Sequence, residues 1–316
     1  MERNQSGITE FILLGLGNSA ELQPLFFSLF LVIYLVTITG NLFIIVLVVA
    51  DPCLHTPMYF FLGNLSCLET CYTSSILPKL LTNLLTGDRT ITVSHCLVQY
   101  YLFGSFAAAE TYLLAAMSCD RYLAICRPFL YTSIMSKKLC FQLMAGAWLN
   151  GLITNGTMVF LITQQNFCGP NVIDHYFCDL TPLEKLSCSD TSSLKLITLL
   201  VAFPDIAIPF IITLTSYISI IITIIKIKSN IGRKKAFSNC SSHLMVVCLF
   251  YGTLIIVYMF PDTPTLRHLK KIFSMFYTVL TPLANPIIYT LRNKDVHKAF
   301  RRLHNKLIIF GRSYLK

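Results

Sequence analysis

Charged side chains occur at unusual places in this chain, beside or inside long apolar stretches. Asp120, Arg121 and Tyr122 follow one another at the end of one such stretch. Arginine stays charged under all ordinary conditions, and burying it deep in hydrocarbon costs several kcal/mol. The triplet therefore suits the boundary of a membrane, where Asp120 holds Arg121 until a partner protein displaces it. The chemistry indicated is regulated ion pairing rather than bond making.

Three further acids lie within apolar stretches: Glu69, Glu110 and Asp205. A carboxylate is costly there and usually marks a functional position with a partner. Asp205 stands between Pro204 and Pro209 and allows two interpretations. It is either an acceptor or counter-ion for a polar ligand, or an acid bonded to neighbouring hydroxyl groups or facing water. The sequence leaves both open.

The composition is that of an integral membrane protein. Of 316 residues, 54% are hydrophobic and 13% are charged, whereas soluble domains carry about 25% charged residues. A membrane span requires roughly 20 mostly apolar residues. Seven segments meet this requirement: residues 24–50, 58–81, 97–119, 139–162, 195–225, 237–260 and 271–291. We expect one all-α membrane domain over residues 1–316, with no soluble enzyme module and no catalytic motif.

The charge distribution predicts the orientation in the membrane. If residues 1–23 are extracellular, most of the 25 Lys and Arg fall in cytoplasmic loops and in the tail, residues 292–316. This is the positive-inside rule. The net charge of +10 then indicates contact with anionic lipid headgroups rather than nucleic acid. No cleavable signal peptide is expected at the start of the chain, and Asn4 is the sequon expected to face outward and carry sugar.

Four of the 12 cysteines fall on the expected outer face: Cys96, Cys168, Cys178 and Cys188. An even number in an oxidising compartment indicates two disulfides, with three possible connectivities. A metal contact is the alternative, because His175, Cys178 and Asp179 are residue types that bind Zn²⁺ or Cu²⁺. Oxidation of Cys178 would remove its thiolate, and the disulfide is the favoured interpretation.

Several motifs occur in order along nearly the whole chain. They are Thr56-Pro57-Met58-Tyr59-Phe60-Phe61-Leu62, the run from Met117 to Cys126, the run from Lys234 to Leu244, and the run from Thr281 to Tyr289. Together they closely resemble the olfactory receptors, a family of rhodopsin-like (family A) G-protein-coupled receptors, and within it the tetrapod-type, airborne-odorant branch. Glu69 departs from the family's aspartate. The resemblance implies a seven-transmembrane helix bundle in the plasma membrane. The spacing of apolar and basic side chains over residues 293–306 predicts a short amphipathic cytoplasmic helix; a disordered basic tail is the alternative for these residues.

The resemblance also implies a function. Such a receptor binds a small volatile molecule and activates a heterotrimeric G protein of the stimulatory class, which raises cAMP. The expected ligand contacts are Phe103, Gly104, Ala107, Ala108, Val201, Ala202, Asp205, Tyr251, Leu254, Ile255, Tyr258, Met275 and Thr278. The residues expected to act in activation are Asp120, Arg121, Tyr122, Tyr217, Tyr251, Asn285, Pro286 and Tyr289. A non-olfactory receptor of the same class, with a small non-volatile ligand, is the alternative.

Two further features follow only from the resemblance. The first is the disulfide pairing, Cys96 with Cys178 and Cys168 with Cys188. The second is a sodium ion among four residues: Glu69, Glu110, Asn41 and Asn285. Two nearby carboxylates cannot both ionise cheaply, so a bound cation or a shared proton would resolve the repulsion. The alternative is that both acids are protonated and only link helices. No other cofactor is expected.

Overall fold

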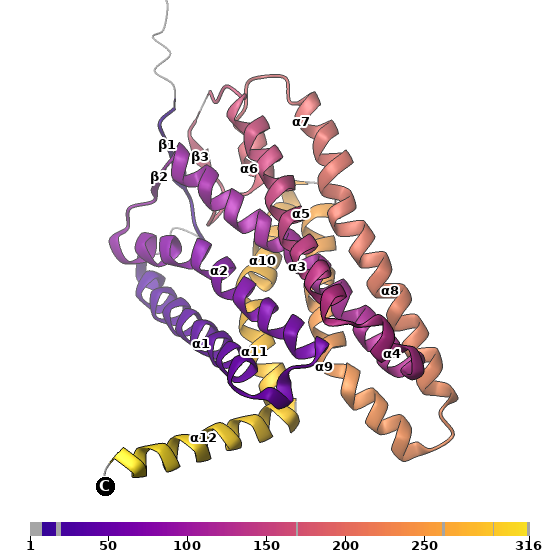
Figure 1. Cartoon of the computed structure of the whole chain (residues 1–316). Coiled ribbons are helices and arrows are strands. Elements are labelled where there is room, and N and C mark those ends of the chain that lie inside the picture. Colours follow the sequence, from indigo (N-terminus) through magenta and orange to yellow (C-terminus); the bar gives the residue numbers. More distant parts are fainter. Residues whose placement is uncertain (1–7, 17–19, 169, 261–262, 293, 315–316) are drawn as a thin grey trace, which may run out of the picture. The chain divides into compact units, whose positions relative to one another are not determined.

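The protein is described by a computed structural model for residues 8–16, 20–168, 170–260, 263–292 and 294–314, and Figure 1 labels its elements. Asn4, the expected glycosylation site, lies outside these residues. Nearly every element is helical. In chain order they are β1 (Glu10–Leu13), η1 (Ala20–Leu22), α1 (Gln23–Ala50), η2 (Pro52–Leu54), α2 (Pro57–Thr86), β2 (Thr90–Thr92), α3 (Val93–Cys126), α4 (Pro128–Ile134), α5 (Lys137–Thr163), β3 (Val172–Ile173), α6 (Leu180–Lys185), α7 (Ser192–Ile197), η3 (Thr198–Ala202), α8 (Phe203–Lys226), α9 (Asn230–Leu254), η4 (Ile255–Met259), α10 (Pro264–Met275), η5 (Phe276–Leu280), α11 (Thr281–Arg292) and α12 (Lys294–Tyr314).

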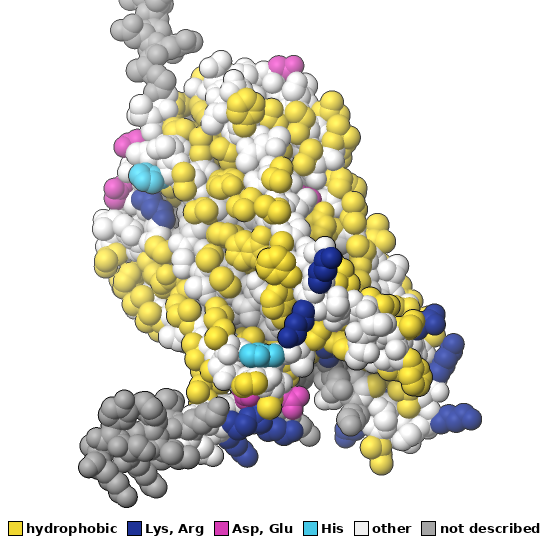
Figure 2. All heavy atoms as spheres, viewed as in Figure 1, with side chains coloured by type: hydrophobic (Ala, Val, Ile, Leu, Met, Phe, Trp, Pro, Cys, Tyr) yellow, Lys and Arg dark blue, Asp and Glu magenta, His cyan; other side chains and the backbone are white. Residues whose placement is uncertain are grey.

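Within the described residues, six helical stretches are long and apolar enough to cross a membrane. They are Gln23–Ala50, Val93–Cys126, Lys137–Thr163, Ser192–Lys226, Cys240–Tyr258 and Leu269–Thr290. Helix α2 has 30 residues, but Glu69, Lys79 and several hydroxyl and amide side chains make it less apolar. Hydrophobic side chains cover much of the face in Figure 2, and many are strongly exposed, such as Val49 (72%) and Ile225 (65%). Soluble monomers rarely expose so much apolar surface. This surface is therefore suited to contact with lipid.

The chain divides into two compact units. Unit 1 comprises Met1–Tyr34, Cys71–Ala109 and Trp148–Ala207, and unit 2 comprises Leu35–Thr70, Glu110–Ala147 and Ile208–Lys316. Unit 1 contains a small sheet that the apolar pattern did not predict. Its strand order is β2-β1-β3, with β1 antiparallel to β2 and parallel to β3.

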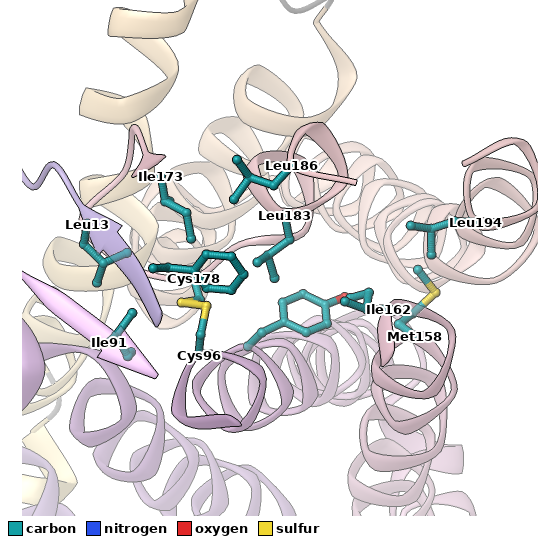
Figure 3. Packing of buried hydrophobic residues seen from close by; sticks show 12 residues of the cluster. Leu13, Ile91, Cys96, Met158, Ile162, Ile173, Cys178, Leu183, Leu186 and Leu194 are labelled. Atoms are coloured by element: carbon teal, nitrogen blue, oxygen red, sulfur yellow. A yellow bond between two sulfur atoms is a disulfide. The ribbon is translucent and has the colours of Figure 1, made fainter. Parts of the chain in front are cut away.

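A disulfide between Cys96 and Cys178 lies within the hydrophobic core of unit 1 (Figure 3). The Cα atoms of this pair are 5.5 Å apart, and those of the second bridge, Cys168–Cys188, are 5.8 Å apart. Both pairs match the connectivity that the resemblance implied. The apolar side chains of the cluster include Phe11, Leu13, Ile91, Tyr100, Met158, Ile162, Ile173, Leu183, Leu186 and Leu194. The cluster therefore joins the sheet to α3, α5 and the long loop between α5 and α7.

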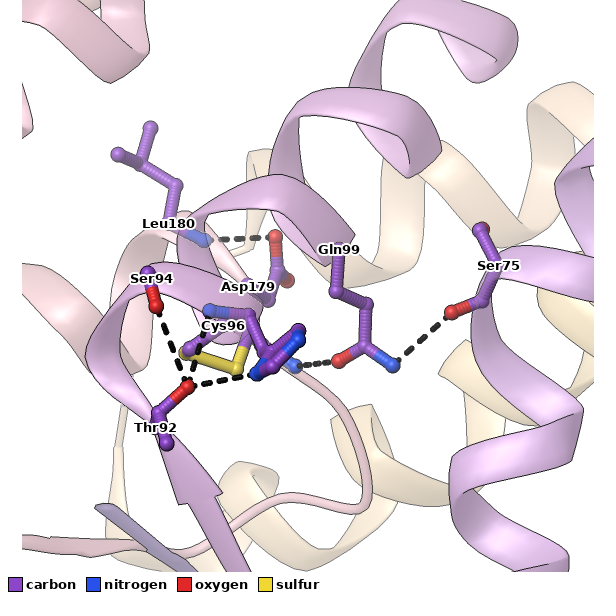
Figure 4. The surroundings of a disulfide bond; sticks show 9 residues. Ser75, Thr92, Ser94, Cys96, Gln99, Asp179 and Leu180 are labelled. Carbon is purple, nitrogen blue, oxygen red and sulfur yellow. Dashed lines mark hydrogen bonds between the residues drawn. A yellow bond between two sulfur atoms is a disulfide. The ribbon is translucent and has the colours of Figure 1, made fainter. Parts of the chain in front are cut away.

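Polar contacts fix the same loop to the helices (Figure 4). The Gln99 Oε1 accepts a hydrogen bond from the Cys178 N–H (3.0 Å), and its Nε2 donates to the Ser75 carbonyl (3.0 Å). Asp179 caps α6, because its Oδ1 accepts from the Leu180 N–H (2.8 Å). Since Cys178 is in a disulfide, it supplies no thiolate, and the metal contact with His175 and Asp179 loses its sulfur ligand.

Helix α12 is fastened to the loop after α1 in unit 2. The Arg302 guanidinium contacts Asp51 Oδ2 through Nε (2.8 Å) and Nη2 (2.7 Å), and Asp51 Oδ1 accepts from the Cys53 N–H (3.0 Å). The rings of Phe43 and Phe300 meet edge to face at 5.5 Å. The helix extends to Tyr314, well beyond the expected residue 306. Because Arg302 pairs with Asp51, part of the polar face of α12 contacts the protein.

The Asp51–Arg302 pair yields a stability prediction. Burial raises the pKa of Asp51, but hydrogen bonds from Cys53 and Arg302 and the guanidinium charge outweigh burial and hold this pKa below its ordinary value. The contribution of the pair is complete at neutral pH and is lost only as the pH falls through that lowered pKa. We expect Asp51→Asn to remove roughly 1 kcal/mol and to lower the melting temperature of the purified protein at pH 7 by about 2–4 °C.

Lys298→Gln is the matched control for this prediction. Lys298 pairs with Asp295 at 3.5 Å, but the two side chains are 65% and 62% exposed, so its loss is expected to leave the melting temperature unchanged. Equal decreases in the two variants would show that Asp51 does not fasten α12.

Candidate functional site

Asp120, at the end of α3 in unit 2, accepts hydrogen bonds from two residues, Arg121 and Tyr131. The side chain of Asp120 is fully buried. Its Oδ2 accepts from Arg121 Nε (3.1 Å) and Nη2 (2.5 Å), and its Oδ1 accepts from the Tyr131 hydroxyl (2.8 Å). Charge-assisted hydrogen bonds of this kind are the strong ones. Both carboxylate oxygens are therefore satisfied, and Arg121 is turned toward its neighbour in sequence. Tyr122 is half-buried beside them.

Tyr131 reaches Asp120 from the short helix α4. Pro128 opens this helix at its first turn, where a missing N–H causes no loss. Burial raises the pKa of Tyr131, and the adjacent Asp120 carboxylate raises it further. The hydroxyl thus remains a proton donor to Asp120 at neutral pH. No role was predicted for Tyr131 from sequence; a hydroxyl-bearing ring a few residues beyond the Arg127-Pro128 break was the available signal.

Three further residues expected to act in activation, like the others, lie in unit 2: Tyr217, Pro286 and Tyr289. The Tyr217 hydroxyl and His243 Nδ1 are 2.6 Å apart, and both side chains are buried. Tyr289 is also buried, and its hydroxyl has no hydrogen-bond partner among the described residues. Pro286 packs closely on α1, since a Cβ at Gly40 would lie 3.0 Å from the Pro286 Cβ. The partner of Tyr217, His243, was not assigned a role from sequence.

The residues expected to hold sodium form a buried polar group in unit 2. Asn285 donates through Nδ2 to Glu69 Oε1, and Asn41 Nδ2 donates to the Pro282 carbonyl (3.3 Å). Glu69 also interacts electrostatically with Glu110. One oxygen of each of these four side chains is buried without a hydrogen-bond partner: Asn41 Oδ1, Glu69 Oε2, Glu110 Oε1 and Asn285 Oδ1. Across the described residues, no group of three or more His, Cys, Asp or Glu side chains is arranged to hold a metal ion.

In unit 2, two of the expected ligand contacts, Tyr251 and Tyr258, have hydrogen bonds within the protein. The Tyr251 hydroxyl donates to the Thr111 carbonyl of α3 (2.9 Å), and its ring lies 5.3 Å from that of Phe210. Tyr258 shares a hydrogen bond with Tyr277 at 3.0 Å. Leu254 and Thr278 are buried, whereas Ile255 and Met275 are half-buried. Tyr251 therefore connects α9 to α3 through a single hydrogen bond.

In unit 1, Phe103 contacts two other aromatic rings: its ring centroid lies 5.2 Å from that of Tyr72 in a tilted arrangement and 4.8 Å from that of Phe177 edge to face. A Cβ at Gly104 would lie 2.2 Å from Asn155 Oδ1, so a side chain of α5 already occupies the space that Gly104 leaves. Ala107 and Ala108 are half-buried on the same helix. The ligand-contacting roles of these residues stay predictions.

Asp205 has a defined partner in unit 1. Its Oδ1 accepts a hydrogen bond from Asn150 Nδ2 (2.8 Å), and Asp205 is 7% exposed. The donor is an amide rather than one of the hydroxyl groups considered from sequence, and a ligand contact of Asp205 stays a prediction. Asn150 was not singled out from sequence. A lone amide in an apolar span was the signal, because such a group requires a partner.

Three stretches of the helices are π-helical: Thr198–Ala202, Ile255–Met259 and Phe276–Leu280. Between them they contain five of the expected ligand contacts: Val201, Ala202, Ile255, Tyr258 and Thr278. Turns of this type are rare and occur often at functional sites. No sequence pattern predicted them, since each replaces one hydrogen-bond register by another within a continuous helix.

Comparisons with known proteins agree over nearly the full chain. A family model described as olfactory receptor matches residues 30–306. Olfactory receptor 5M5 of Mus musculus is 47% identical over 306 residues, covering 97% of this chain and 96% of that protein. Olfactory receptor 5G3 of Homo sapiens is 45% identical over 312 residues, covering 98% and 99%. Olfactory receptor 11A1 of Homo sapiens is 47% identical over 296 residues, covering 94% of each.

The Asn150–Asp205 contact makes a prediction about stability. Replacing Asn150 by Leu removes a donor from a buried carboxyl group, which costs about 1–3 kcal/mol. We expect Asn150→Leu to lower the melting temperature of the purified protein by several degrees. The double variant Asn150→Leu/Asp205→Leu should recover part of that loss, because the buried carboxyl group that lost its amide donor is then itself removed. Losses of stability that add fully in the double variant, or exceed the sum of the two single changes, would show that the two side chains do not stabilise the protein as a pair.

Proposed function

This chain belongs to the olfactory receptor family of G-protein-coupled receptors, and on that premise we propose that it binds a small volatile molecule and activates a stimulatory G protein. Its fold class is the seven-transmembrane helix bundle, and it is not an enzyme. The observation that carries the proposal is similarity to an olfactory receptor over 97% of the chain. The activated G protein raises the concentration of cAMP in the cell.

The proposed ligand contacts are those expected from the sequence. Apolar and aromatic walls with a few polar groups are typical of small-molecule sites, and the residues around Tyr251 and Phe103 have this character. The π-helical turns at Val201, Ile255 and Thr278 support the assignment. Asp205 contributes an acceptor for a polar ligand, held in place by Asn150.

The proposed switch is the group of contacts around Asp120. A ligand shifts a receptor between two arrangements only through different affinities for them. At rest, Arg121 is bound to Asp120, which Tyr131 also holds. In the active arrangement Arg121 leaves Asp120 and meets the G protein, with Tyr217 and Tyr289 moving alongside. Loss of the Tyr251–Thr111 hydrogen bond connects ligand binding to movement of α9.

Sodium is the proposed ion for the polar group at Glu69. Small hard cations prefer oxygen ligands, and the four unpaired oxygens of Asn41, Glu69, Glu110 and Asn285 are of that kind. When bound, the ion supplies positive charge that offsets the carboxylates. Asn285 then orients the Glu69 carboxyl through its own hydrogen bond.

The proposed location is the plasma membrane, with the N-terminus extracellular. This orientation puts the basic segments, including α12, beside anionic lipid of the inner leaflet. Phe300 is 47% exposed on α12, and an apolar ring next to basic side chains suits the surface of a bilayer.

The function is tested in cells that express this chain with the olfactory stimulatory G protein. Volatile amines, acids, alcohols, aldehydes and ketones are applied singly, and cAMP is measured at matched surface expression. We expect a saturable response to at least one volatile, which Arg121→Ala abolishes. Asp205→Asn should change the response to polar volatiles only. If no volatile of the panel changes cAMP although the chain is present at the cell surface, the proposal is overturned.

The resting contacts predict the effect of two conservative changes. Asp120→Asn weakens the hold on Arg121, and Tyr131→Phe removes one hydrogen bond worth about 1 kcal/mol. We expect each to raise basal cAMP, by roughly fivefold for Tyr131→Phe. Tyr34→Phe is the control, since it removes a tyrosine hydroxyl that contacts only Ser74 in the described hydrogen bonds. Unchanged basal cAMP in Tyr131→Phe would rule out Tyr131 as part of the restraint.

A further inference from the structure

The two disulfides of unit 1 differ in their exposure. Cys96 and Cys178 are both 0% exposed, within the hydrophobic cluster shown in Figure 3, whereas Cys168 and Cys188 are both exposed. Neither cysteine of the exposed bridge falls within a stretch long and apolar enough to cross a membrane, so water surrounds them. A thiol opens a disulfide by attacking one of its sulfur atoms, and the reaction requires access. Attack by a dissolved thiol is therefore directed to the Cys168–Cys188 bridge.

The two segments that this bridge joins are also held together by backbone hydrogen bonds. The Cys188 N–H donates to the Asn166 carbonyl (2.9 Å), and the Cys168 N–H donates to the Leu186 carbonyl (3.3 Å). Neither bond requires the S–S bond, so both keep the two cysteines opposite each other after the bridge opens. The bridge is therefore able to open and close again while the surrounding fold persists.

The bridge restrains the segment that leads into a helix with proposed odorant contacts. Cys188 lies just before α7, which continues through η3 into α8, and Val201 and Asp205 lie on this continuous helix. The ion pair between Glu184 of α6 and Lys195 of α7 measures 3.3 Å, but the Lys195 side chain is 67% exposed, and such surface pairs contribute little. Opening the bridge removes a covalent restraint and therefore gives the segment before α7 more freedom.

We propose that the Cys168–Cys188 bridge is a modification site for low-molecular-weight thiols, which open it reversibly. The thiolate of the small molecule attacks one sulfur atom of the bridge, a new S–S bond forms there, and the S–S bond of the bridge breaks. The other cysteine leaves as a thiolate and takes a proton from water. When this cysteine loses its proton again and attacks the mixed disulfide, the small thiol is released and the bridge is restored. No other oxidant or reductant takes part.

The covalent step is independent of the proposed odorant function, whereas its effect on signalling rests on that function. Binding to contacts that are less well ordered costs additional entropy. We therefore expect a thiol to raise the odorant concentration for a half-maximal response by about fivefold, which corresponds to about 1 kcal/mol.

The modification is tested by cysteine labelling of the purified full chain in lipid nanodiscs. The free cysteines are first blocked with N-ethylmaleimide, and ethanethiol or glutathione is then added at increasing concentration. Thiols that appear are labelled with deuterated N-ethylmaleimide and mapped by mass spectrometry. We expect label at Cys168 and Cys188 at a thiol concentration about tenfold or more below that required for Cys96 and Cys178, because access controls the exchange.

The two probes distinguish the sources of the thiol. Reaction with glutathione would identify secreted peptide thiols as a source, and reaction with ethanethiol alone would identify volatile thiols; both results support the modification. Equal labelling of the two bridges at every concentration, or no label at Cys168 and Cys188 until a denaturant is added, would overturn the proposal.

Two variants separate the bridge from other thiol effects on signalling. The double variant Cys168→Ser/Cys188→Ser lacks the bridge, so added thiol should not change its odorant response. Cys53→Ser removes an exposed free cysteine and should keep the full thiol effect. An equal thiol effect in the double variant would overturn the link between this bridge and signalling. If the double variant does not reach the cell surface, or no volatile activates the chain, the labelling result still decides whether the bridge is modified.

Discussion

The buried carboxylate of Asp120 is the constraint on which the end of α3 depends. An ion removed from water is stable only when its partners replace the lost hydration, and Asp120 is fully buried. Arg121 supplies the compensating charge and Tyr131 supplies a hydrogen bond from a separate helix. This requirement fixes the direction of Arg121 and the position of α4 together. Weakening either partner leaves the same buried charge less satisfied.

Buried polar groups elsewhere within each unit also have partners that replace their lost hydration. Asn285 holds Glu69, Asn150 holds Asp205, and Tyr217 is bonded to His243. The coupling energy of such a pair between membrane helices averages roughly 0.6 kcal/mol, whereas removing one partner alone costs more because the other is left unsatisfied. These contacts therefore serve mainly to set which helix faces meet. Close packing then depends on small residues. A Cβ at Gly151 would lie 2.2 Å from the Ser105 carbonyl oxygen, so α3 and α5 approach there through backbone contact.

Much of this arrangement was predictable from sequence. The features that were not predicted depend on physical factors that the sequence pattern does not contain. Long apolar runs predict helices because hydrocarbon forces the backbone to bond internally, and motifs along the chain indicated the family. The hydrogen-bond and ion-pair partners of buried polar side chains were harder to predict. Nothing in the local pattern places Asn150 beside Asp205, or Arg302 beside Asp51, because these contacts depend on how separate segments pack. Nor does the local pattern show that the Asn155 side chain occupies the space beside Gly104.

The proposed restraint of the receptor by Tyr131, acting through Asp120, is tested most directly by a double-mutant cycle. Basal cAMP is measured at equal surface expression for the unchanged chain, Asp120→Asn, Tyr131→Phe and the double variant. If Tyr131 acts through Asp120, the double variant signals no more than the stronger single variant, since both changes remove one interaction. If the two increases multiply, Tyr131 acts through some other contact, and its hydrogen bond to Asp120 does not hold the resting state.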